Sequence, residues 1–350
     1  MEINMKKVCL IFGGRSSEHE VSLMSASAIL SGIDSSKYET VFLGITKDGK
    51  WYFYEGESSK IKDGSWINDS ENLTKACLST SFGEKALLLA DGRKISVDVM
   101  YPAVHGENCE DGRLQGLFEL AGIPFVGPGS LASAVCMDKS VTKSILNEIN
   151  IPQAKAIVVN DYDKAGGYAD AFAWAEKMGY PLFVKPTSAG SSVGSSKVSS
   201  KDELAGALDN ALIYGGKALI EEYIKGREIE VAVRGNDELT VSVCGEIDPG
   251  FEFYDYDTKY KNDTASYYIP ARLSEETSKK VREYAKKIYK ALGCRGLSRV
   301  DFFVTESEDI FFNEINTLPG FTSISMYPKL MMNEGMSFTE LISSLIELAK

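Results

Sequence analysis

Apolar positions in the first third of the chain form short runs that alternate with segments of helical periodicity. The run "KKVCLIF" at 6–12 predicts a strand buried on both faces, whereas "EHEVSLMSASAILSGI" at 18–33 has apolar residues at helical spacing. The predicted elements are strands at 6–12, 40–46, 97–104 and 123–127, and helices at 18–33 and 112–122. Alternating strands and helices are typical of a parallel sheet, so we predict an α/β domain over residues 1–127.

Two further units follow this domain. A helix at 138–150 ends before Pro152, and short strands around a Gly/Ser-rich segment come next. From Gly226 the predicted strands become longer. The expected elements are strands at 180–186, 195–198 and 217–224, a hairpin at 301–316, and helices at 201–213, 274–292 and 336–349. Hairpins mixed with helices favour α+β architecture, so we predict domains over 128–225 and 226–350.

Residues 248–271 interrupt this regular pattern. The segment is polar and rich in tyrosine, and it has neither a clean strand period nor a clean helix period. A loop of this length in a compact protein is usually functional or disordered, and its aromatic content weighs against disorder. We therefore expect it to become ordered over a ligand, with slower amide hydrogen exchange when ligand is bound.

The predicted hairpin, within "DFFVTESEDIFFNEINTLPG" at 301–320, carries acids in unusual places. Side chains alternate along a strand, so Glu314 and Asn316 share one face, and the returning strand brings Asp301 level with them. Charged strand ends commonly face solvent, which is one interpretation. The other is a hard-cation site, because Mg²⁺ takes oxygen ligands, usually one or two carboxylates together with substrate phosphates.

Composition and charge narrow the classes of function. The chain has 350 residues, 44% hydrophobic and 25% charged, as in a globular protein of two or three domains with a sizeable core. A net charge of -12 argues against a nucleic-acid partner, which would need a basic surface. No apolar run is long enough for a membrane span or a signal segment, and the six cysteines lack CxxC spacing. We therefore expect a cytoplasmic protein with reduced thiols and no membrane partner.

The segment "FGGRSSEHEVS" at 12–22 follows the first predicted strand. Two glycines before a helix start are a common anion-binding arrangement, but the dinucleotide fingerprint GxGxxG is absent. Ser17 and Glu20 fit a capping box, which would explain Glu20 without any ligand. Glu18 has no such explanation, which makes it a candidate ligand-binding residue.

The segment "FVKPTSAGSSVGSSKV" at 183–198 places Lys185 on a strand before a Gly/Ser loop. Gly190 and Gly194 would let backbone N–H groups approach phosphate oxygens, although a flexible hairpin turn explains the loop equally well. The pattern GxxxxGK[ST] is absent, so this is not a P-loop of the Walker type.

A third candidate site is "HGENCEDG" at 105–112. His105 follows a predicted buried strand, at the edge of a parallel sheet where α/β proteins place their ligands. A simple polar turn is the alternative. Cys109 is a conceivable nucleophile, but the sequence indicates no partner arrangement for it.

Seven segments together resemble the D-alanine–D-alanine ligase family. They are "GGRSSEHEVSL", "HGENCEDGRLQGLFELAGIPFVG", "MDKSVTK", "FVKPTSAGSSVGSSKV", "FYDYDTKY", "GLSRVDFF" and "NEINTLPGFTS". They occur in the order found in the family and span nearly the whole chain. The resemblance implies an ATP-grasp fold, with an N-terminal α/β substrate-binding domain and two α+β domains that hold ATP between them.

The resemblance also implies roles for individual residues. By similarity, Asp301, Glu314 and Asn316 hold two Mg²⁺ or Mn²⁺ ions on the ATP phosphates, with Glu314 shared. The implied nucleotide-binding residues are Lys139, Lys185, Ser192, Glu221, Glu222, Tyr223, Ile224 and Glu228. The implied catalytic residues are Glu18, Ser191, Tyr260, Arg299 and Gly320, and the implied substrate-binding residues are His105, Lys259, Ser325 and Met326.

The implied reaction is the ATP-dependent ligation of two D-alanine molecules through an acyl phosphate, for peptidoglycan precursor synthesis. A homodimer is expected because it is the usual state in the family. Met326 favours D-alanine as second substrate, because some D-serine enzymes have an arginine there, and Tyr260 argues against D-lactate, whose ligases have histidine instead.

Several alternatives remain open. A D-alanine–D-serine ligase of the vancomycin-resistance type and another ATP-grasp ligase both share the ATP chemistry. A non-enzymatic nucleotide-binding regulator would not release ADP when D-alanine is added. A Rossmann dehydrogenase is the weakest alternative, because the fingerprint is missing.

Overall fold

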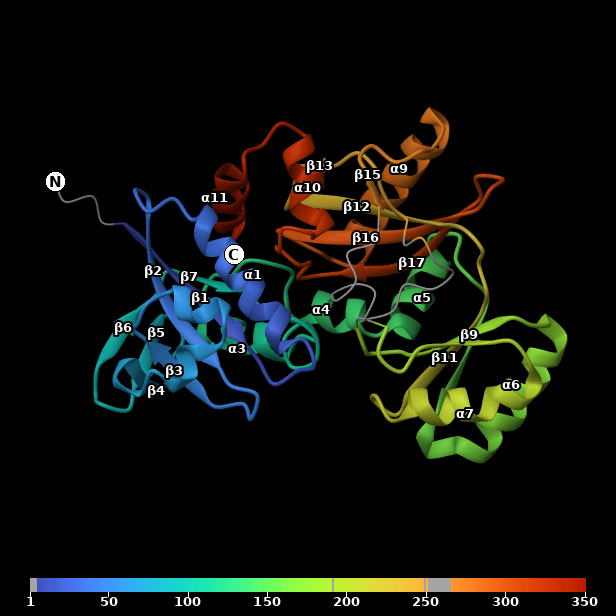
Figure 1. The fold of residues 1–350 in the computed structure, drawn as a ribbon, viewed down its shortest axis with the longest axis horizontal. Helices are drawn as coiled ribbons and strands as arrows, with labels where there is room; N and C mark the ends of the chain where they lie inside the picture. The colour runs from blue at the N-terminus through green and yellow to red at the C-terminus, as the bar shows by residue number, and fades with distance from the viewer. Residues whose placement is uncertain (1–4, 191, 249, 251–265) are drawn as a thin grey trace.

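The computed structural model describes residues 5–190, 192–248, 250 and 266–350. Within these residues the chain forms sheets of seven, four and six strands (Figure 1). The seven-stranded sheet is built from residues 6–102, the four-stranded sheet from residues 156–222 and the six-stranded sheet from residues 227–316. In Figure 1 the first two sheets lie at opposite ends of the molecule, with the third between them. The predicted combination of α/β and α+β parts is confirmed.

The first sheet has the strand order β6-β5-β4-β3-β2-β1-β7. Its strands are β1 (Lys6–Gly13), β2 (Tyr38–Ile45), β3 (Trp51–Tyr54), β4 (Leu73–Leu78), β5 (Ala86–Leu89), β6 (Lys94–Ser96) and β7 (Val99–Pro102). Strand β1 pairs in parallel with β2 and β7, as the sequence predicts. Strands β3 to β6 continue the sheet in antiparallel fashion, which the sequence analysis did not predict. These strands are short and partly exposed, so their hydrophobic period is weak.

The strand predicted at 123–127 is wrong. Phe125 makes only one isolated parallel bridge, to Met100 on β7. Pro124 has no backbone N–H for a sheet ladder, and Gly122 and Gly127 have positive φ angles, so the backbone turns at both ends of the apolar run.

The capping box predicted from Ser17 and Glu20 is also wrong. Helix α1 (His19–Gly32) begins one residue later than this box requires, with Glu18 in place of Ser17 at its N-cap and no side-chain cap hydrogen bond. Glu20 forms an exposed ion pair with Lys47 instead. Glu20 therefore does not cap the helix, and Glu18 lies at the helix start without capping it through its side chain.

The second sheet, with four strands, is antiparallel and has the order β10-β9-β11-β8. Its strands are β8 (Ala156–Asn160), β9 (Leu182–Pro186), β10 (Ser196–Val198) and β11 (Lys217–Glu222), and its helices are α6 (Lys164–Met178) and α7 (Lys201–Leu212). Leu182 and Val184 on β9 belong to a buried cluster with both helices. Phe183 and Lys185 alternate with them and line a cavity on the other face.

The third sheet has the order β15-β14-β12-β16-β17, with β13 also paired to β12. Its strands are β12 (Arg227–Gly235), β13 (Leu239–Val241), β14 (Gly245–Asp248), β15 (Ser266–Tyr268), β16 (Leu297–Val304) and β17 (Ile310–Asn316). Val300 and Phe302 on β16 pack into a buried cluster with helix α9 (Glu275–Ala291). Arg299 and Asp301 alternate with them along the strand and therefore face the opposite side of the sheet.

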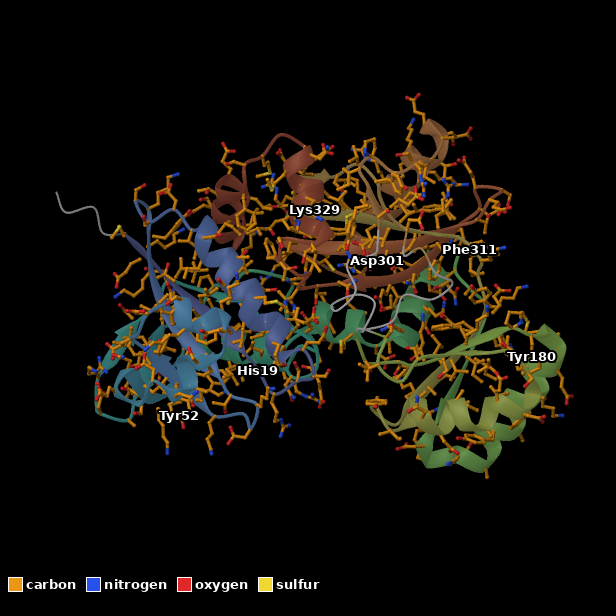
Figure 2. All side chains as sticks on the ribbon, viewed as in Figure 1. His19, Tyr52, Tyr180, Asp301, Phe311 and Lys329 are labelled. Carbon is orange, nitrogen blue, oxygen red and sulfur yellow. The ribbon has the colours of Figure 1, made fainter. Side chains whose placement is uncertain are left out.

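The predicted hairpin at 301–316 is confirmed as β16 and β17, and Figure 2 shows Asp301 and Phe311 at different points along it. The register pairs Asp301 with Glu314 and Arg299 with Asn316. The polar groups that the sequence predicted to lie level with one another therefore do so.

The other α-helices of the described residues are α2 (Ser59–Lys62), α3 (Arg113–Ala121), α4 (Ser130–Met137), α5 (Lys139–Glu148), α10 (Met326–Asn333) and α11 (Phe338–Leu348).

A shared core joins the first and third domains. Leu10 and Phe12 of β1 belong to the same buried cluster as Leu330 of α10 and Leu345 of α11. This packing fixes the loop after β17 against the first domain, which matters for the site described next. Within the described residues no helix is long and apolar enough to cross a membrane.

Candidate active site

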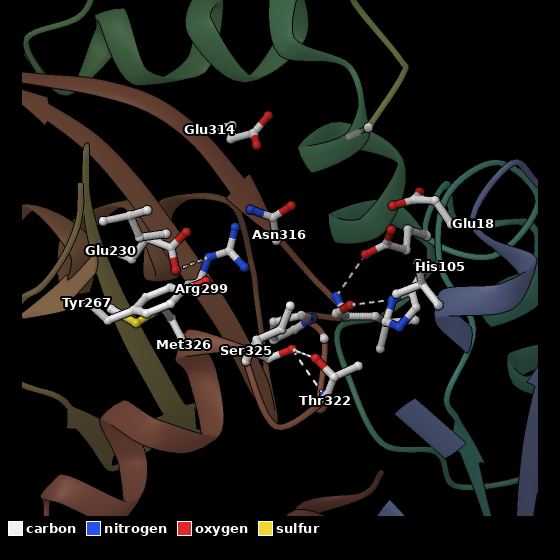
Figure 3. Close-up of a pocket in the computed structure, with 18 residues that line it drawn as sticks. Glu18, His105, Glu230, Tyr267, Arg299, Glu314, Asn316, Thr322, Ser325 and Met326 are labelled. Atoms are coloured by element: carbon white, nitrogen blue, oxygen red, sulfur yellow. Dashed lines mark hydrogen bonds and ion pairs between the residues drawn. The ribbon is translucent and has the colours of Figure 1, made fainter. Parts of the chain in front are cut away.

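Two cavities meet near the middle of the molecule. The larger one has a volume of about 410 Å³ and lies between the second sheet and the third sheet. The smaller one has a volume of about 90 Å³ and lies between the first domain and the third sheet (Figure 3). Glu314 and Gly190 line both cavities. A ligand in one cavity would therefore end beside a ligand in the other.

A buried carboxylate with two lysines forms one side of the larger cavity. The Glu221 carboxylate on β11 forms ion pairs with two ammonium groups, with Lys185 Nζ at 2.6 Å from Oε2 and Lys143 Nζ at 2.7 Å from Oε1. All three side chains are buried. Burial alone would raise the pKa of Glu221, but the two lysines lower it below its ordinary value. The result is an ionised acceptor beside cationic groups in a cavity of the size that binds small molecules and cofactors.

Lys139 connects this cavity with the hairpin. It is the first residue of α5, whose N-cap Asp138 accepts hydrogen bonds from the backbone N–H groups of Ser140 and Val141. The Lys139 ammonium lies 3.2 Å from the Glu314 carboxylate and donates to the carbonyl oxygen of Ala189 at 3.0 Å. The helix therefore holds a cation at the point where the two cavities meet.

Asp301, Glu314 and Asn316 come together as an oxygen-rich group. The Asn316 amide donates to Asp301 Oδ2 at 2.9 Å, and Glu314 is the register partner of Asp301 on the neighbouring strand. Two carboxylates and one amide oxygen suit Mg²⁺ or Mn²⁺, which prefer hard oxygen ligands and take remaining ligands from water and phosphate. This donor set fits the metal site that the sequence analysis expects.

Arg299 lies beneath this group and is held by two carboxylates. It donates to Asp301 through Nε at 2.8 Å and Nη2 at 2.7 Å, and it lies 2.9 Å from Glu230 Oε2 (Figure 3). Burial opposes its charge, yet Asp301 and Glu230 raise the pKa of Arg299 above its ordinary value. A permanently charged guanidinium therefore lines the smaller cavity.

His105 also lines the smaller cavity, and both of its ring nitrogens have partners. Nδ1 lies 3.1 Å from the carbonyl oxygen of Leu318, and Nε2 lies 2.9 Å from the Ser25 hydroxyl. Burial lowers the pKa of His105 despite the nearby Glu18 charge, so the ring is neutral at pH 7. A carbonyl oxygen can only accept, so Nδ1 carries the proton and Nε2 accepts from Ser25.

Glu18 and Glu110 are two acidic residues that line the smaller cavity near His105. Figure 3 shows Glu18 beside the loop that carries His105, on the side away from Met326. Glu110 accepts hydrogen bonds from the backbone N–H groups of Gly106 at 2.7 Å and Leu318 at 3.2 Å. Burial and the Glu18 charge raise the pKa of Glu110 to about 8. Glu18 and the Arg299 guanidinium, which line the same cavity, could bind the ammonium and the carboxylate of a zwitterion.

The remaining wall of the smaller cavity is mostly apolar. Met326, Tyr267 and Ile247 line it, and the Met326 side chain packs over Gly245, where an added Cβ would meet Met326 Cε at 2.2 Å. The Ser325 hydroxyl accepts from the backbone N–H of Thr322 at 3.0 Å, and Gly320 lines the cavity next to it. A small aliphatic group would find an apolar surface here.

The structure places most of the predicted site residues around these two cavities. The larger cavity is lined by Lys139, Lys185, Ser192, Glu221, Glu222, Tyr223, Ile224, Glu228 and Glu314. The smaller cavity is lined by Glu18, His105, Arg299, Glu314, Asn316, Gly320, Ser325 and Met326. Asp301 contacts Arg299 and Asn316 below it. Ser191, Lys259 and Tyr260 lie outside the described residues, as does most of the loop at 248–271.

Three residues at or near the site, Lys143, Glu230 and Glu110, were not predicted from the sequence, where Cys109 was only a conceivable nucleophile. Glu230 alternates with Ile229 and Val231 of a buried strand, and a buried acid in an apolar run is a signal that could have identified it. Glu110 and Lys143 stand in short polar segments, so their contacts were not visible in the sequence. Burial raises the pKa of Cys109, which leaves it a protonated thiol rather than a nucleophile.

Two antiparallel sheets that enclose a cavity lined by lysines, with an oxygen-rich group at its inner end, define this protein as an ATP-grasp ligase. Residues 7–128 match the family model described as "D-ala D-ala ligase N-terminus", and residues 145–347 match "D-ala D-ala ligase C-terminus". The chain belongs to the D-alanine–D-alanine ligase family.

Individual relatives agree with this membership over the full length. The chain is 50% identical to a D-alanine--D-alanine ligase of Acetivibrio thermocellus, over 98% of this chain and 96% of that protein. It is 48% identical to a D-alanine--D-alanine ligase of Clostridium novyi, over 98% of each. Among solved structures it resembles the VanG D-Ala:D-Ser ligase from Enterococcus faecalis, with a TM-score of 0.91, 44% identity and 99% of each chain covered. The D-alanine-D-alanine ligase from Coxiella burnetii has a TM-score of 0.85 and 34% identity, covering 98% of this chain and 93% of that one.

Proposed function

We propose that this protein joins two D-alanine molecules to D-alanyl-D-alanine at the expense of ATP, for peptidoglycan precursor synthesis. The observation that carries the proposal is that Glu314 and Gly190 line both cavities. ATP in the larger cavity would place its terminal phosphate beside Glu314, next to the carboxylate of an amino acid in the smaller cavity. This is the proximity that phosphoryl transfer between two bound substrates requires.

The larger cavity supplies groups for each part of ATP. Glu221 is an ionised acceptor suited to the exocyclic amine of adenine, with Tyr223 and Ile224 beside it and Glu228 available for the ribose. Lys185 and Lys139 would meet the phosphates, and Ser192 belongs to the Gly/Ser loop that would cover them. Asp301, Glu314 and Asn316 would hold two Mg²⁺ or Mn²⁺ ions, which neutralise phosphate charge when bound.

The smaller cavity would orient the first D-alanine for activation. Glu18 accepts the ammonium group, and the substrate carboxylate then points toward Glu314 and the terminal phosphate. Lys139 lies 3.2 Å from Glu314 and reduces the repulsion between the approaching anions. The carboxylate attacks the γ-phosphorus, ADP departs, and an acyl phosphate results.

The second step requires a neutral amine and a place for negative charge. The amine of the second D-alanine attacks the acyl phosphate carbon, and the carbonyl oxygen becomes a tetrahedral oxyanion. Arg299 and the Gly320 N–H would stabilise this charge, a contribution of about 3 kcal/mol per donor. Phosphate leaves as the carbonyl re-forms, the nitrogen gives up its extra proton to the departing phosphate, and the peptide bond is complete. Ser191, Lys259 and Tyr260 would complete the site by resemblance.

The second substrate is proposed to be D-alanine rather than D-serine. Met326 offers an apolar surface for a methyl group, and a methionine side chain has no strong hydrogen-bond donor for a hydroxyl. An unpaired buried hydroxyl costs about 1–3 kcal/mol, which corresponds to about a five- to hundredfold preference. The similarity to the VanG D-Ala:D-Ser ligase is the reason to test this directly.

A coupled assay of ADP release with single amino acids tests the proposal. D-alanine should release ADP and yield D-alanyl-D-alanine, whereas no ADP release with D-alanine would refute the ligase assignment. Equal D-alanine and D-serine in competition, with products separated by mass, then tests the second site. An excess of D-alanyl-D-serine would contradict the preference for D-alanine that is proposed for the second site.

The homodimer and the domain limits stay predictions. Sedimentation can test the homodimer, and limited proteolysis can test the domain limits.

A further inference from the structure

The peptide group on each side of Leu318 is held by a different side chain of the first domain. The Leu318 N–H donates to Glu110 at 3.2 Å, and the Leu318 carbonyl oxygen accepts from His105 Nδ1 at 3.1 Å. Glu110 is 208 positions and His105 is 213 positions before Leu318 in the sequence. Figure 3 shows both hydrogen bonds converging on the same short loop segment.

Each of the two side chains is itself fixed. The second oxygen of Glu110 accepts from the Gly106 N–H at 2.7 Å, which ties the carboxylate to its own loop. Ser25 donates to His105 Nε2 at 2.9 Å and thereby selects the tautomer whose Nδ1–H faces Leu318. The same Ser25 hydroxyl also accepts from the Phe321 N–H at 3.5 Å. The loop 318–321 is therefore bound to the first domain on both sides of Gly320.

We propose that Glu110, supported by His105 and Ser25, is a positioning residue that fixes the oxyanion-binding backbone at Gly320 relative to the first substrate. The inference rests on the proposed function, because it concerns where the tetrahedral oxyanion forms. Glu110 lines the smaller cavity and not the larger one. It acts through the Leu318 backbone, two residues before Gly320.

This role separates the two chemical steps. Phosphoryl transfer to the first substrate depends on the lysines and the oxygen-rich group near Glu314, which Glu110 does not contact. Attack by the second amine depends on the oxyanion site, where a displacement of about 1 Å can cost about a hundredfold in rate. Loosening the loop should therefore leave acyl phosphate formation intact while slowing its conversion, and the waiting acyl phosphate would hydrolyse.

The charges around Glu110 are consistent with coupling to the first substrate. Glu18 faces it and repels its negative charge, and Arg299 attracts it. An ammonium group bound at Glu18 would cancel the repulsion and favour the ionised carboxylate, which accepts with both oxygens. Binding of the first substrate would then strengthen the hydrogen bond to Leu318.

The test compares Glu110→Gln with Glu107→Gln. Glutamine keeps the shape but presents an NH₂ group to one of the two N–H donors, whereas Glu107 is exposed in the same loop and pairs only at 3.7 Å with Arg113. ADP and dipeptide are measured together at saturating substrates. In E110Q we expect dipeptide formation to fall about ten- to hundredfold, with ADP release falling less and KM for ATP unchanged. E107Q should keep one dipeptide per ADP at the wild-type rate.

A second variant guards against misfolding of the first. Ser25→Ala removes the hydroxyl that fixes the His105 tautomer, and it should lower the ratio of dipeptide to ADP in the same direction, by a smaller factor. An unchanged ratio in folded E110Q, or in S25A if E110Q does not fold, would overturn the inference. If the wild-type protein forms no dipeptide from D-alanine, it is the proposed function that fails, and the ratio experiment separates these two results.

Discussion

The two cavities are built in different ways. The larger one lies between two antiparallel sheets, and most of its charged groups come from strands β9, β11, β12, β14 and β17 and from the start of helix α5. The smaller one is lined mainly by loops and strand ends of two domains, and several contacts across it join residues more than 200 positions apart. Their volumes are about 410 and 90 Å³.

The difference concerns how precisely each site must hold its ligand. A nucleotide is large and is recognised by many groups, so regular strands with alternating side chains suffice to place them. Two small amino acids must meet at a defined angle, and their site depends on a few hydrogen bonds between domains. Perturbing the larger cavity should therefore affect nucleotide binding, whereas perturbing the smaller one should affect turnover and coupling.

The largest expected effect comes from Glu314, a carboxylate that lines both cavities. Glu314→Gln removes one carboxylate of the proposed metal site and the partner of Lys139, and ligation should fall by about a thousandfold or more. Folding should be almost unchanged, since Glu314 lies outside the buried clusters, and circular dichroism would check this. Glu308→Gln, at the turn of the same hairpin, is the matched control. Turnover near the wild-type rate in E314Q at saturating Mg²⁺ would rule out the two-metal assignment.

Glu230 should affect the smaller cavity more than the larger one. It is buried and lies 2.9 Å from Arg299, so Glu230→Gln leaves a buried guanidinium with one carboxylate fewer. We expect a loss of about 3 kcal/mol in the free energy of unfolding and about a tenfold decrease of kcat. Urea denaturation and steady-state kinetics measure the two effects. A rise in KM for ATP with normal kcat would contradict the division between the cavities.

Lys143 should affect the larger cavity alone. Burial lowers the pKa of Lys143, and its ammonium nevertheless pairs with Glu221 at 2.7 Å. In Lys143→Met, Glu221 would keep only Lys185, which would then be less available to phosphate. We expect KM for ATP to rise about tenfold, with KM for D-alanine unchanged. Lys155→Met, an exposed lysine nearby, serves as the control. A change confined to KM for D-alanine would be evidence against this prediction.

The smallest effect is expected at the turn of the hairpin, away from both ligands. Glu308 accepts from Ser274 and Thr277 at the start of α9, and these bonds lower the pKa of Glu308 to about 2. A carboxylate with a lowered folded-state pKa stabilises the protein above about pH 4.5, and this contribution is lost as the pH falls through 2. Glu308→Gln should therefore lower Tm by about 1–2 °C near neutral pH and change it little near pH 2. Equal differences at both pH values would show that the charge is not responsible.

Much of the fold and of the nucleotide cavity could be predicted from the sequence. Glu314 and Asn316 share one face because side chains alternate along a strand, as predicted, whereas a register shift between Asp301 and Phe302 places Asp301 opposite Glu314. Lys185 stands on a strand before a Gly/Ser loop, so a local pattern identified it, whereas the role of Glu221 came only from the family resemblance. Helices α2, α4, α6 and α10 were not predicted, and α6 contains two adjacent glycines that weaken its helical signal.

The sequence by itself determined the strand and helix pattern of most elements, the hairpin and the family to which the chain belongs, because these depend on local periodicity and on contiguous motifs. The tertiary structure alone decided that Glu110 and His105 bind one peptide segment at Leu318, and that Glu230 pairs with Arg299. It also decided that the first sheet continues with antiparallel strands. Such contacts depend on which distant surfaces pack together, and the free energy that selects them comes from a core shared between domains, which no local pattern encodes.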